Sequence, residues 1–186
     1  RRSEATAWLH DSPAGLRVPS GACARVAPRS PQVIAGVSWI TEMHWTGWSP
    51  IDESCTHGGP AVYEIRLVDP ASGPARLNRF LGTDPGGILC IGETGELERR
   101  RKQFIAAWHK GGNHSEGDLL HLLEAHSPFL RVFPNSRLEM RYGAVSVKEE
   151  AKAQEEKRLK AYVRIYGEVP PLNSSIPDRD GSWGTS

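Results

Sequence analysis

Two arginines on one predicted helix are candidates for binding a phosphate group. They lie in GGILCIGETGELERRRKQF, residues 86–104, where an apolar run is followed by a helix that begins acidic and turns basic. At about 100° per residue, Arg100 and Arg101 lie on either side of the apolar stripe of this helix. The donor fork of a guanidinium matches two phosphate oxygens. The same spacing is typical of arginines that reach water past a buried stripe, so both interpretations stay open.

A carboxylate on the last predicted helix, residues 148–166, is a candidate metal ligand. The apolar residues of this helix cover about 120° of its circumference, and Glu155 lies near the centre of that arc. An ionised carboxylate in an apolar stripe is costly unless it is paired or binds a metal ion. The pattern therefore indicates either a metal-binding or catalytic acid, or a buried ion pair with an arginine.

The elements that position these side chains follow from the periodicity of the chain. Alternation of apolar and polar residues predicts strands at 61–68, 75–82, 88–92 and 137–145, and the first three are expected to form a meander. Helical patterns cover residues 95–110, 114–126 and 148–166. Strands and helices that segregate in this way predict an α+β domain with a small antiparallel sheet flanked by helices.

Three regions are expected along the chain. Residues 1–59 form an N-terminal extension, of which the first 35 residues are rich in Pro, Ala, Ser and Arg and show no period. Tryptophans crowd the stretch 39–48, and their apolar area predicts that it packs against the domain, with a lid or a DNA-facing platform as the alternative. Residues 60–175 form the main domain, and residues 176–186 form a polar tail.

Composition limits the class of protein only loosely. The chain has 23 Lys and Arg against 22 Asp and Glu, so any nucleic-acid surface must group its basic residues on one face. Three cysteines (Cys23, Cys55 and Cys90) without CxxC spacing argue against a disulfide framework and for a reducing compartment. The sequence contains no apolar run near the roughly 18 residues of a membrane span and no signal-peptide pattern, and its first residue is not Met. We expect a cytoplasmic protein with no membrane partner.

Five features, in order, resemble the GIY-YIG nucleases. They are AVY at 61–63, CIG at 90–92, an arginine in the next helix, EAKAQE at 150–155 and an asparagine at 173. The resemblance covers roughly residues 60–175 and is closest to bacterial restriction-type or stand-alone members. It implies a three-stranded antiparallel sheet flanked by helices, in agreement with the periodicity.

The resemblance also assigns roles to particular residues. Tyr63 is the tyrosine of the first motif, and Arg100 is the helix arginine. Glu155 is the metal-binding glutamate, with Glu156 as the alternative if the helix register differs by one residue. Asn173 corresponds to the asparagine that closes the site in several members.

Two further positions are less regular. Cys90 stands where the second motif of the family has a tyrosine, which helps to orient the attacking water or to tune its neighbour. A thiol near Arg100 is either a partial thiolate or a small buried core residue, and the change brings full activity into question. His114 resembles a histidine often found after the first helix, with a surface histidine that precedes a helix as the alternative.

The function implied is that of a metal-dependent endonuclease that hydrolyses phosphodiester bonds in DNA, expected to be double-stranded. Glu155 would hold one Mg²⁺ or Mn²⁺, and Arg100, helped by Arg101, would neutralise the charge of the phosphate. Lys102 would extend the phosphate-binding face. Tyr63 would orient or deprotonate the attacking water, and the second role requires nearby arginines to lower its pKa from about 10.

Three alternatives remain at this stage. The first is a nucleic-acid-binding module of the same fold without turnover, suggested by Cys90. The second is a small zinc-stabilised interaction protein, with ligands drawn from His44, Cys55, His57 and Cys23. The third is that Glu155 only pairs with an arginine to fix the position of its helix.

Overall fold

The computed structural model describes residues 43–112, 114–133 and 137–179. Its main sheet is antiparallel and has three long strands, which are β2 (Ala61–Asp69), β6 (Ile88–Thr94) and β7 (Arg137–Ala144). Strand β2 lies in the middle, between β6 and β7. The two-residue strands β1 (Ser49–Pro50) and β3 (Gly73–Pro74) extend the sheet to five strands. The α+β class with an antiparallel sheet is thus confirmed, and the sheet is larger than the three strands expected.

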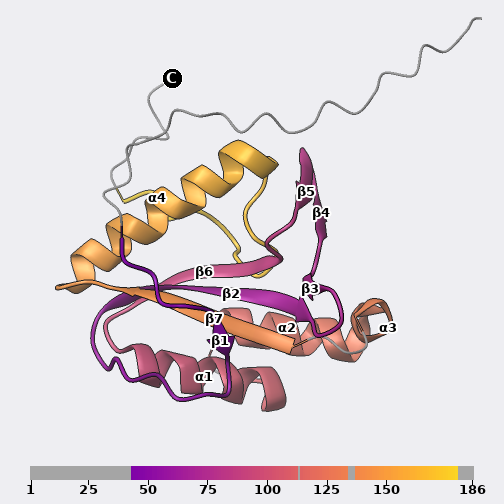
Figure 1. Ribbon diagram of the computed structural model, residues 1–186, viewed down its shortest axis with the longest axis horizontal. Coiled ribbons are helices and arrows are strands. Elements are labelled where there is room, and N and C mark those ends of the chain that lie inside the picture. Colours follow the sequence, from indigo (N-terminus) through magenta and orange to yellow (C-terminus); the bar gives the residue numbers. More distant parts are fainter. Residues whose placement is uncertain (1–42, 113, 134–136, 180–186) are drawn as a thin grey trace, which may run out of the picture. The chain divides into compact units, whose positions relative to one another are not determined.

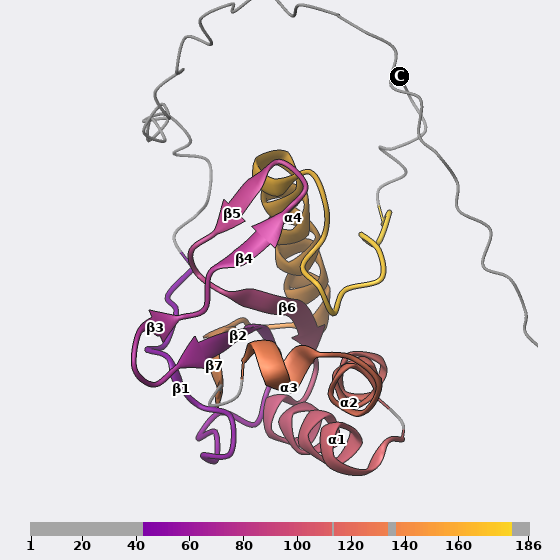
Figure 2. The ribbon, with the colours of Figure 1, turned by 90° about the vertical axis from the view of Figure 1, so that its right-hand side faces the viewer.

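Helices cover both faces of the sheet. Helices α1 (Leu97–Lys110) and α2 (Ser115–His126), with the single turn α3 (Phe129–Val132), lie on one side, and α4 (Lys148–Tyr166) lies on the other (Figures 1 and 2). Each side has its own apolar core. Tyr63 and Phe104 belong to the core under α1, whereas Ile91 packs with Leu159 under α4. No helix among the described residues is both long and apolar enough to traverse a lipid bilayer.

The expected meander is wrong at its second strand. Residues of the predicted strand 75–82 leave the main sheet and form a separate hairpin of β4 (Leu77–Arg79) and β5 (Gly82–Asp84). Strand β7 takes the place beside β2, because it brings Leu138 and Met140 into the core. The hairpin instead lies near the end of α4, where the Leu81 amide donates to the Tyr166 carbonyl over 3.0 Å.

The segment before β2 packs on the α4 side of the sheet through its tryptophans. Arg141 lies over the rings of both Trp45 and Trp48, at 4.8 and 4.5 Å from their centroids. Arg158 also lies over Trp45, and Arg66 over Trp48. These cation–π contacts use the ring faces inside the protein, which favours packing over a DNA-facing platform for this part of the stretch. The rest of the stretch, residues 39–42, lies outside the described residues.

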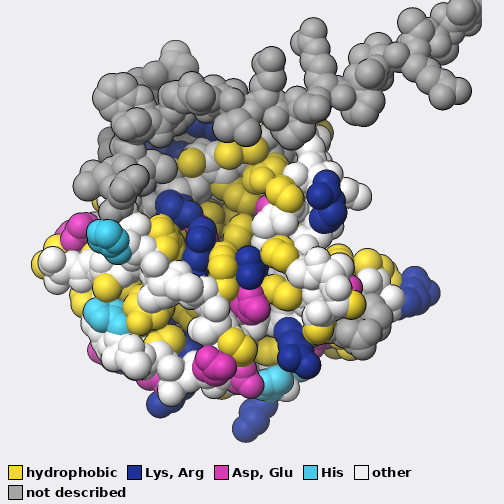
Figure 3. Space-filling view, in the orientation of Figure 1, with side chains coloured by type: hydrophobic (Ala, Val, Ile, Leu, Met, Phe, Trp, Pro, Cys, Tyr) yellow, Lys and Arg dark blue, Asp and Glu magenta, His cyan; other side chains and the backbone are white. Residues whose placement is uncertain are grey.

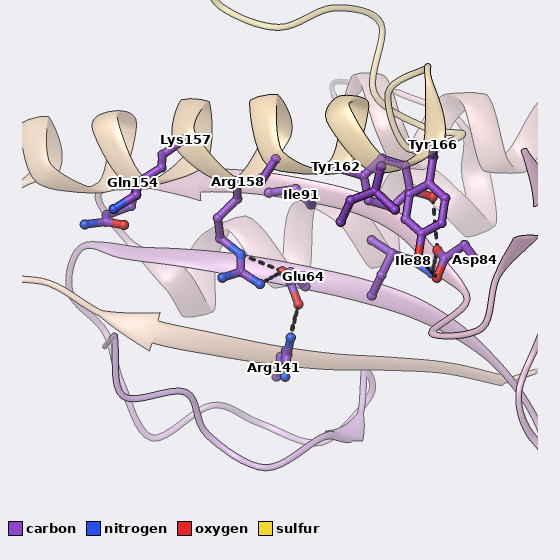
Figure 4. A pocket seen from close by; sticks show the side chains of 12 residues that line it. Glu64, Asp84, Ile88, Ile91, Arg141, Gln154, Lys157, Arg158, Tyr162 and Tyr166 are labelled. Atoms are coloured by element: carbon purple, nitrogen blue, oxygen red, sulfur yellow. Dashed lines mark hydrogen bonds and ion pairs between the residues drawn. The ribbon is translucent and has the colours of Figure 1, made fainter. Parts of the chain in front are cut away.

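A buried carboxylate joins α4 to the sheet. Glu64 of β2 accepts hydrogen bonds from Nε of Arg158 on α4 and from Nε of Arg141 on β7, each over 2.7 Å (Figure 4). Its side chain is only 3% exposed. Between this cluster and Tyr162 lies a cavity of about 220 Å³ with an apolar floor that includes Ile91, in the hollow visible in Figure 3. Glu64 therefore joins helix α4 to the sheet at the border of this cavity.

We expect Glu64→Gln to lower the free energy of unfolding by about 3 kcal/mol, because two guanidinium groups lose one shared buried carboxylate. Glu139→Gln is the matched control, since Glu139 pairs with Arg66 on the same face and its side chain is 24% exposed. The control should cost less than about 1 kcal/mol. Urea denaturation followed by circular dichroism measures both changes, and equal losses would contradict this account of Glu64.

Candidate functional site

The sheet brings the first two motif segments side by side. Tyr63 on β2 lies opposite Gly92 on β6, and its side chain is fully buried. A Cβ atom at position 92 would lie 2.4 Å from the Tyr63 Oη. Only glycine at this position leaves room for the phenol, so Gly92 is part of the site even though it offers no side chain.

Arg100 on α1 reaches the same phenol. Its Nε donates a hydrogen bond to the Tyr63 Oη over 3.2 Å, and its Nη2 lies 3.5 Å from the Glu116 Oε2. The side chain of Arg100 is 31% exposed. One guanidinium is therefore held from inside by a tyrosine while part of it remains open to solvent.

Arg101 and Lys102 do not join this cluster. Arg101 is buried, and it donates to both carboxylate oxygens of Glu98 over 2.8 Å and to the Ile51 carbonyl over 2.7 Å. These contacts tie α1 to the end of β1, so the predicted phosphate contact of Arg101 does not fit its position. Lys102 is exposed and lies 3.4 Å from Glu98, and its contact with nucleic acid stays a prediction.

The start of α2 adds two residues from the other side. His114 directly precedes the helix, and its Nδ1 donates to the Glu116 Oε2 over 3.0 Å, with the Gly117 amide 3.4 Å from the same atom. It is buried rather than on the surface, and its Nε2 has no hydrogen-bond partner among the described residues. Burial alone raises the pKa of Glu116, but hydrogen bonds from His114 and Ser115 outweigh it and lower that pKa to about 2. Glu116 therefore stays ionised beside Arg100.

Burial decides the ionisation of Tyr63 and Cys90. It raises the pKa of Tyr63 well above 10, and the opposing effect of Arg100 is smaller. Arg100 lowers this pKa as expected, but burial outweighs it, so Tyr63 serves as a fixed hydrogen-bond partner of Arg100 and not as a base. Burial, helped by the negative charge of Glu116, likewise raises the pKa of Cys90 well above 9. The thiolate interpretation is therefore also wrong, and Cys90 is a neutral core residue.

Glu155 approaches this cluster from the opposite layer. It is buried on α4, and its Oε2 accepts a hydrogen bond from Arg179 over 2.7 Å. Burial and the negative charges of Glu93 and Glu116 raise its pKa, against the opposing charge of Arg179. The charges of Glu155, Glu116 and Arg100 all act on the thiol of Cys90. Charged side chains of α1, α2 and α4 thus act on one residue of β6, a long strand at the edge of the sheet.

The side chain of the predicted asparagine binds the backbone of this strand. The Asn173 side chain donates to the Ile91 carbonyl over 2.8 Å and accepts from the Ile91 amide over 3.0 Å. The neighbouring Leu172 amide donates to the Leu89 carbonyl. Asn173 therefore fixes the position of β6 next to Cys90, and its amide group is committed to the backbone.

The carboxylates around Glu155 suit a hard divalent cation. Glu93, one of the two acidic neighbours that raise the pKa of Glu155, has a buried Oε2 with no hydrogen-bond partner among the described residues. Carboxylate oxygens are the ligands that Mg²⁺ and Mn²⁺ prefer. The described ranges contain no group of three or more His, Cys, Asp or Glu placed to hold an ion together. A divalent ion here would thus depend on Glu155 together with water and substrate oxygens, which is usual for Mg²⁺.

The same finding bears on the two other metal assignments. Glu156, the alternative ligand, is buried beside Lys160, with 2.7 Å between the Lys160 Nζ and its Oε1. For zinc, His44, Cys55 and His57 form no such cluster within the part of the chain that is described, and Cys23 lies outside it.

Sequence reasoning missed two acids of the site, Glu93 and Glu116. Glu93 directly follows the CIG segment, and Glu116 follows His114 by two residues. Proximity to these motif residues is the signal that could have identified both acids. Comparison with known proteins adds no assignment, since no family model, no curated protein and no solved structure matches this chain.

Proposed function

We propose that the protein is an endonuclease that requires a divalent metal ion and hydrolyses phosphodiester bonds in DNA. The observation that supports this most is that a partly exposed Arg100, held by Tyr63, and the desolvated carboxylate of Glu155 both act by their charges on Cys90 of β6. A cation for the phosphate and an acid for a metal ion are two of the requirements of phosphodiester hydrolysis.

Arg100 binds the scissile phosphate in this proposal. Tyr63 fixes the Nε side of the guanidinium, and burial keeps the phenol protonated, so this hydrogen bond persists at neutral pH. The contact with Glu116 is long, at 3.5 Å, and a phosphate oxygen at 2.7–2.9 Å would replace it as the stronger partner. Glu116 then serves to orient Arg100 before the substrate arrives.

Glu155 holds the cation. A bound Mg²⁺ or Mn²⁺ would neutralise charge on the phosphoryl oxygens and lower the pKa of a coordinated water. Arg179 already occupies Oε2 of this carboxylate, so an ion that binds there has to compete with the guanidinium. Cys90 and Asn173 keep the strand between Arg100 and Glu155 in place and take no part in proton transfer.

A second candidate function is a nucleic-acid-binding module without turnover. It is favoured by the ion pair of Glu155 with Arg179, which satisfies the buried carboxylate without a metal ion. In that case Arg100 would still bind phosphate.

Incubation of the full chain with supercoiled plasmid, linear duplex, single-stranded DNA and RNA tests the proposal. We expect nicking or cutting of duplex DNA with Mg²⁺ or Mn²⁺ and none with EDTA. Binding of DNA without cleavage under any metal condition would favour the module, and neither binding nor cleavage would overturn both functions.

A further inference from the structure

The side of α4 that carries its lysines has a basic cleft of about 480 Å³. Its charged lining consists of Lys152, Lys157, Lys160, Arg164 and Arg179, with the acids Glu149 and Glu156. The lining runs from position 149 to position 164 of the helix, which is about 22 Å at 1.5 Å per residue. We call this surface the α4 cleft.

The α4 cleft concentrates positive charge in a nearly neutral protein. Five cations and two acids give it a net charge of 5 − 2 = +3, whereas the whole chain carries +1, so the remaining residues sum to 1 − 3 = −2. One of the two acids, Glu156, already lies 2.7 Å from a lysine of the same cleft. The grouping of basic residues that a nucleic-acid surface requires is therefore found here.

Arg179 connects the cleft to the candidate site. Its Nη2 donates to Glu155, its Nη1 donates to the Lys152 carbonyl, and the residue lines the cleft. If a metal ion takes the carboxylate of Glu155, the released guanidinium lies in the cleft as a further phosphate ligand. Length also fits, because about 22 Å matches roughly six phosphates of one strand at 3.4 Å of helix axis each.

We propose that the α4 cleft binds the phosphate backbone of nucleic acid and holds the strand that leads away from the candidate site. That the nucleic-acid strand leads away from the candidate site rests on the proposed function, whereas phosphate binding by the cleft does not. Lysines that contact phosphates contribute to affinity and salt dependence and leave sequence preference unchanged.

The test measures binding of the full chain to a labelled 20-base-pair duplex in EDTA, by fluorescence anisotropy between 50 and 200 mM salt. Lys152→Ala with Arg164→Ala removes a charge near each end of the cleft. Each lost phosphate contact should reduce the steepness of log K against log salt by about 0.9, so we expect a reduction of about 1.8 and weaker binding at low salt. The double variant Arg76→Ala with Arg99→Ala removes the same charge from exposed positions outside the cleft and should leave the slope unchanged.

An unchanged slope in the cleft variant, equal slope losses in both variants, or no duplex binding by the parent protein would overturn the inference. Tighter binding to phosphatidylserine vesicles than to the duplex would also overturn it, in favour of a membrane surface. If the parent protein cleaves DNA with metal ions and the cleft variant binds the duplex as the parent does, only this inference is refuted. If the cleft variant shows the reduced slope of log K against log salt but the parent protein never cleaves DNA, only the proposed hydrolysis is refuted.

Discussion

Arg100→Lys should reduce the rate of metal-dependent DNA cleavage by about 100-fold or more while the fold stays intact. The guanidinium of Arg100 meets Tyr63 with its Nε and Glu116 with its Nη2, which sets the plane of the group. A lysine carries one compact ammonium and cannot keep the bond to the phenol while presenting two donors to a phosphate. Initial rates of plasmid nicking at saturating Mg²⁺ measure the change, with circular dichroism as the check on folding.

The neighbouring arginine provides the control for Arg100. Arg99 is 69% exposed and lies 3.3 Å from Glu96 at the surface of α1. Arg99→Lys should cut at the rate of the parent protein. A folded Arg100→Lys protein that cuts as fast as this control would show that the guanidinium is not at the reacting phosphate.

Glu155→Gln should abolish both cleavage and the tight binding of Mn²⁺, because an amide keeps the shape of the side chain and removes its charge. Arg179→Ala should have the opposite effect on the ion, since it removes the cation that pairs with Glu155 over 2.7 Å. A partly exposed pair of this kind is worth about 1 kcal/mol, so Mn²⁺ should bind about fivefold more tightly. Electron paramagnetic resonance of free Mn²⁺ measures binding independently of cleavage.

The pH dependence of Mn²⁺ binding gives a further check on Glu155. Burial and two acidic neighbours raise the pKa of this carboxyl above its ordinary value of 4.5, so its proton competes with the ion at a higher pH than in an exposed glutamate. Mn²⁺ binding should weaken on acidification before exposed carboxylates begin to protonate. Glu53→Gln, which changes an exposed acid before β2, should leave Mn²⁺ binding unaffected. If Arg179→Ala and Glu155→Gln bind Mn²⁺ as the parent does, the ion does not use this carboxylate.

The fold was predictable wherever local periodicity was strong. Helix α4 covers the predicted residues 148–166, and the alternation around Tyr63 correctly predicts β2. The hairpin of β4 and β5 was misassigned, because alternation identifies a strand but not its partner. The choice of β7 as partner depends on the apolar residues that distant segments bring to the same core.

Two charged residues of the candidate site were predictable, but not the protonation of its groups. Glu155 stands out because its charge interrupts an apolar stripe, and Arg100 because its charge borders one. Glu116 does not interrupt one, and it joins the site only because α2 starts beside α1. The high pKa of Tyr63 depends on complete burial, and a sequence pattern can indicate that a strand is half-buried but not how far water is excluded from one hydroxyl.

The two residues that accompany β6 have a consequence for the behaviour of the protein in concentrated solution. An apolar strand at the border of a sheet is a template on which another chain can add its own strand and start aggregation. Leu172 occupies the carbonyl of Leu89, and Asn173 occupies both the amide and the carbonyl of Ile91, which are groups that another strand would use. The stretch after α4 therefore protects the edge strand from self-association. A chain that ends before residue 172 would expose these groups and should aggregate.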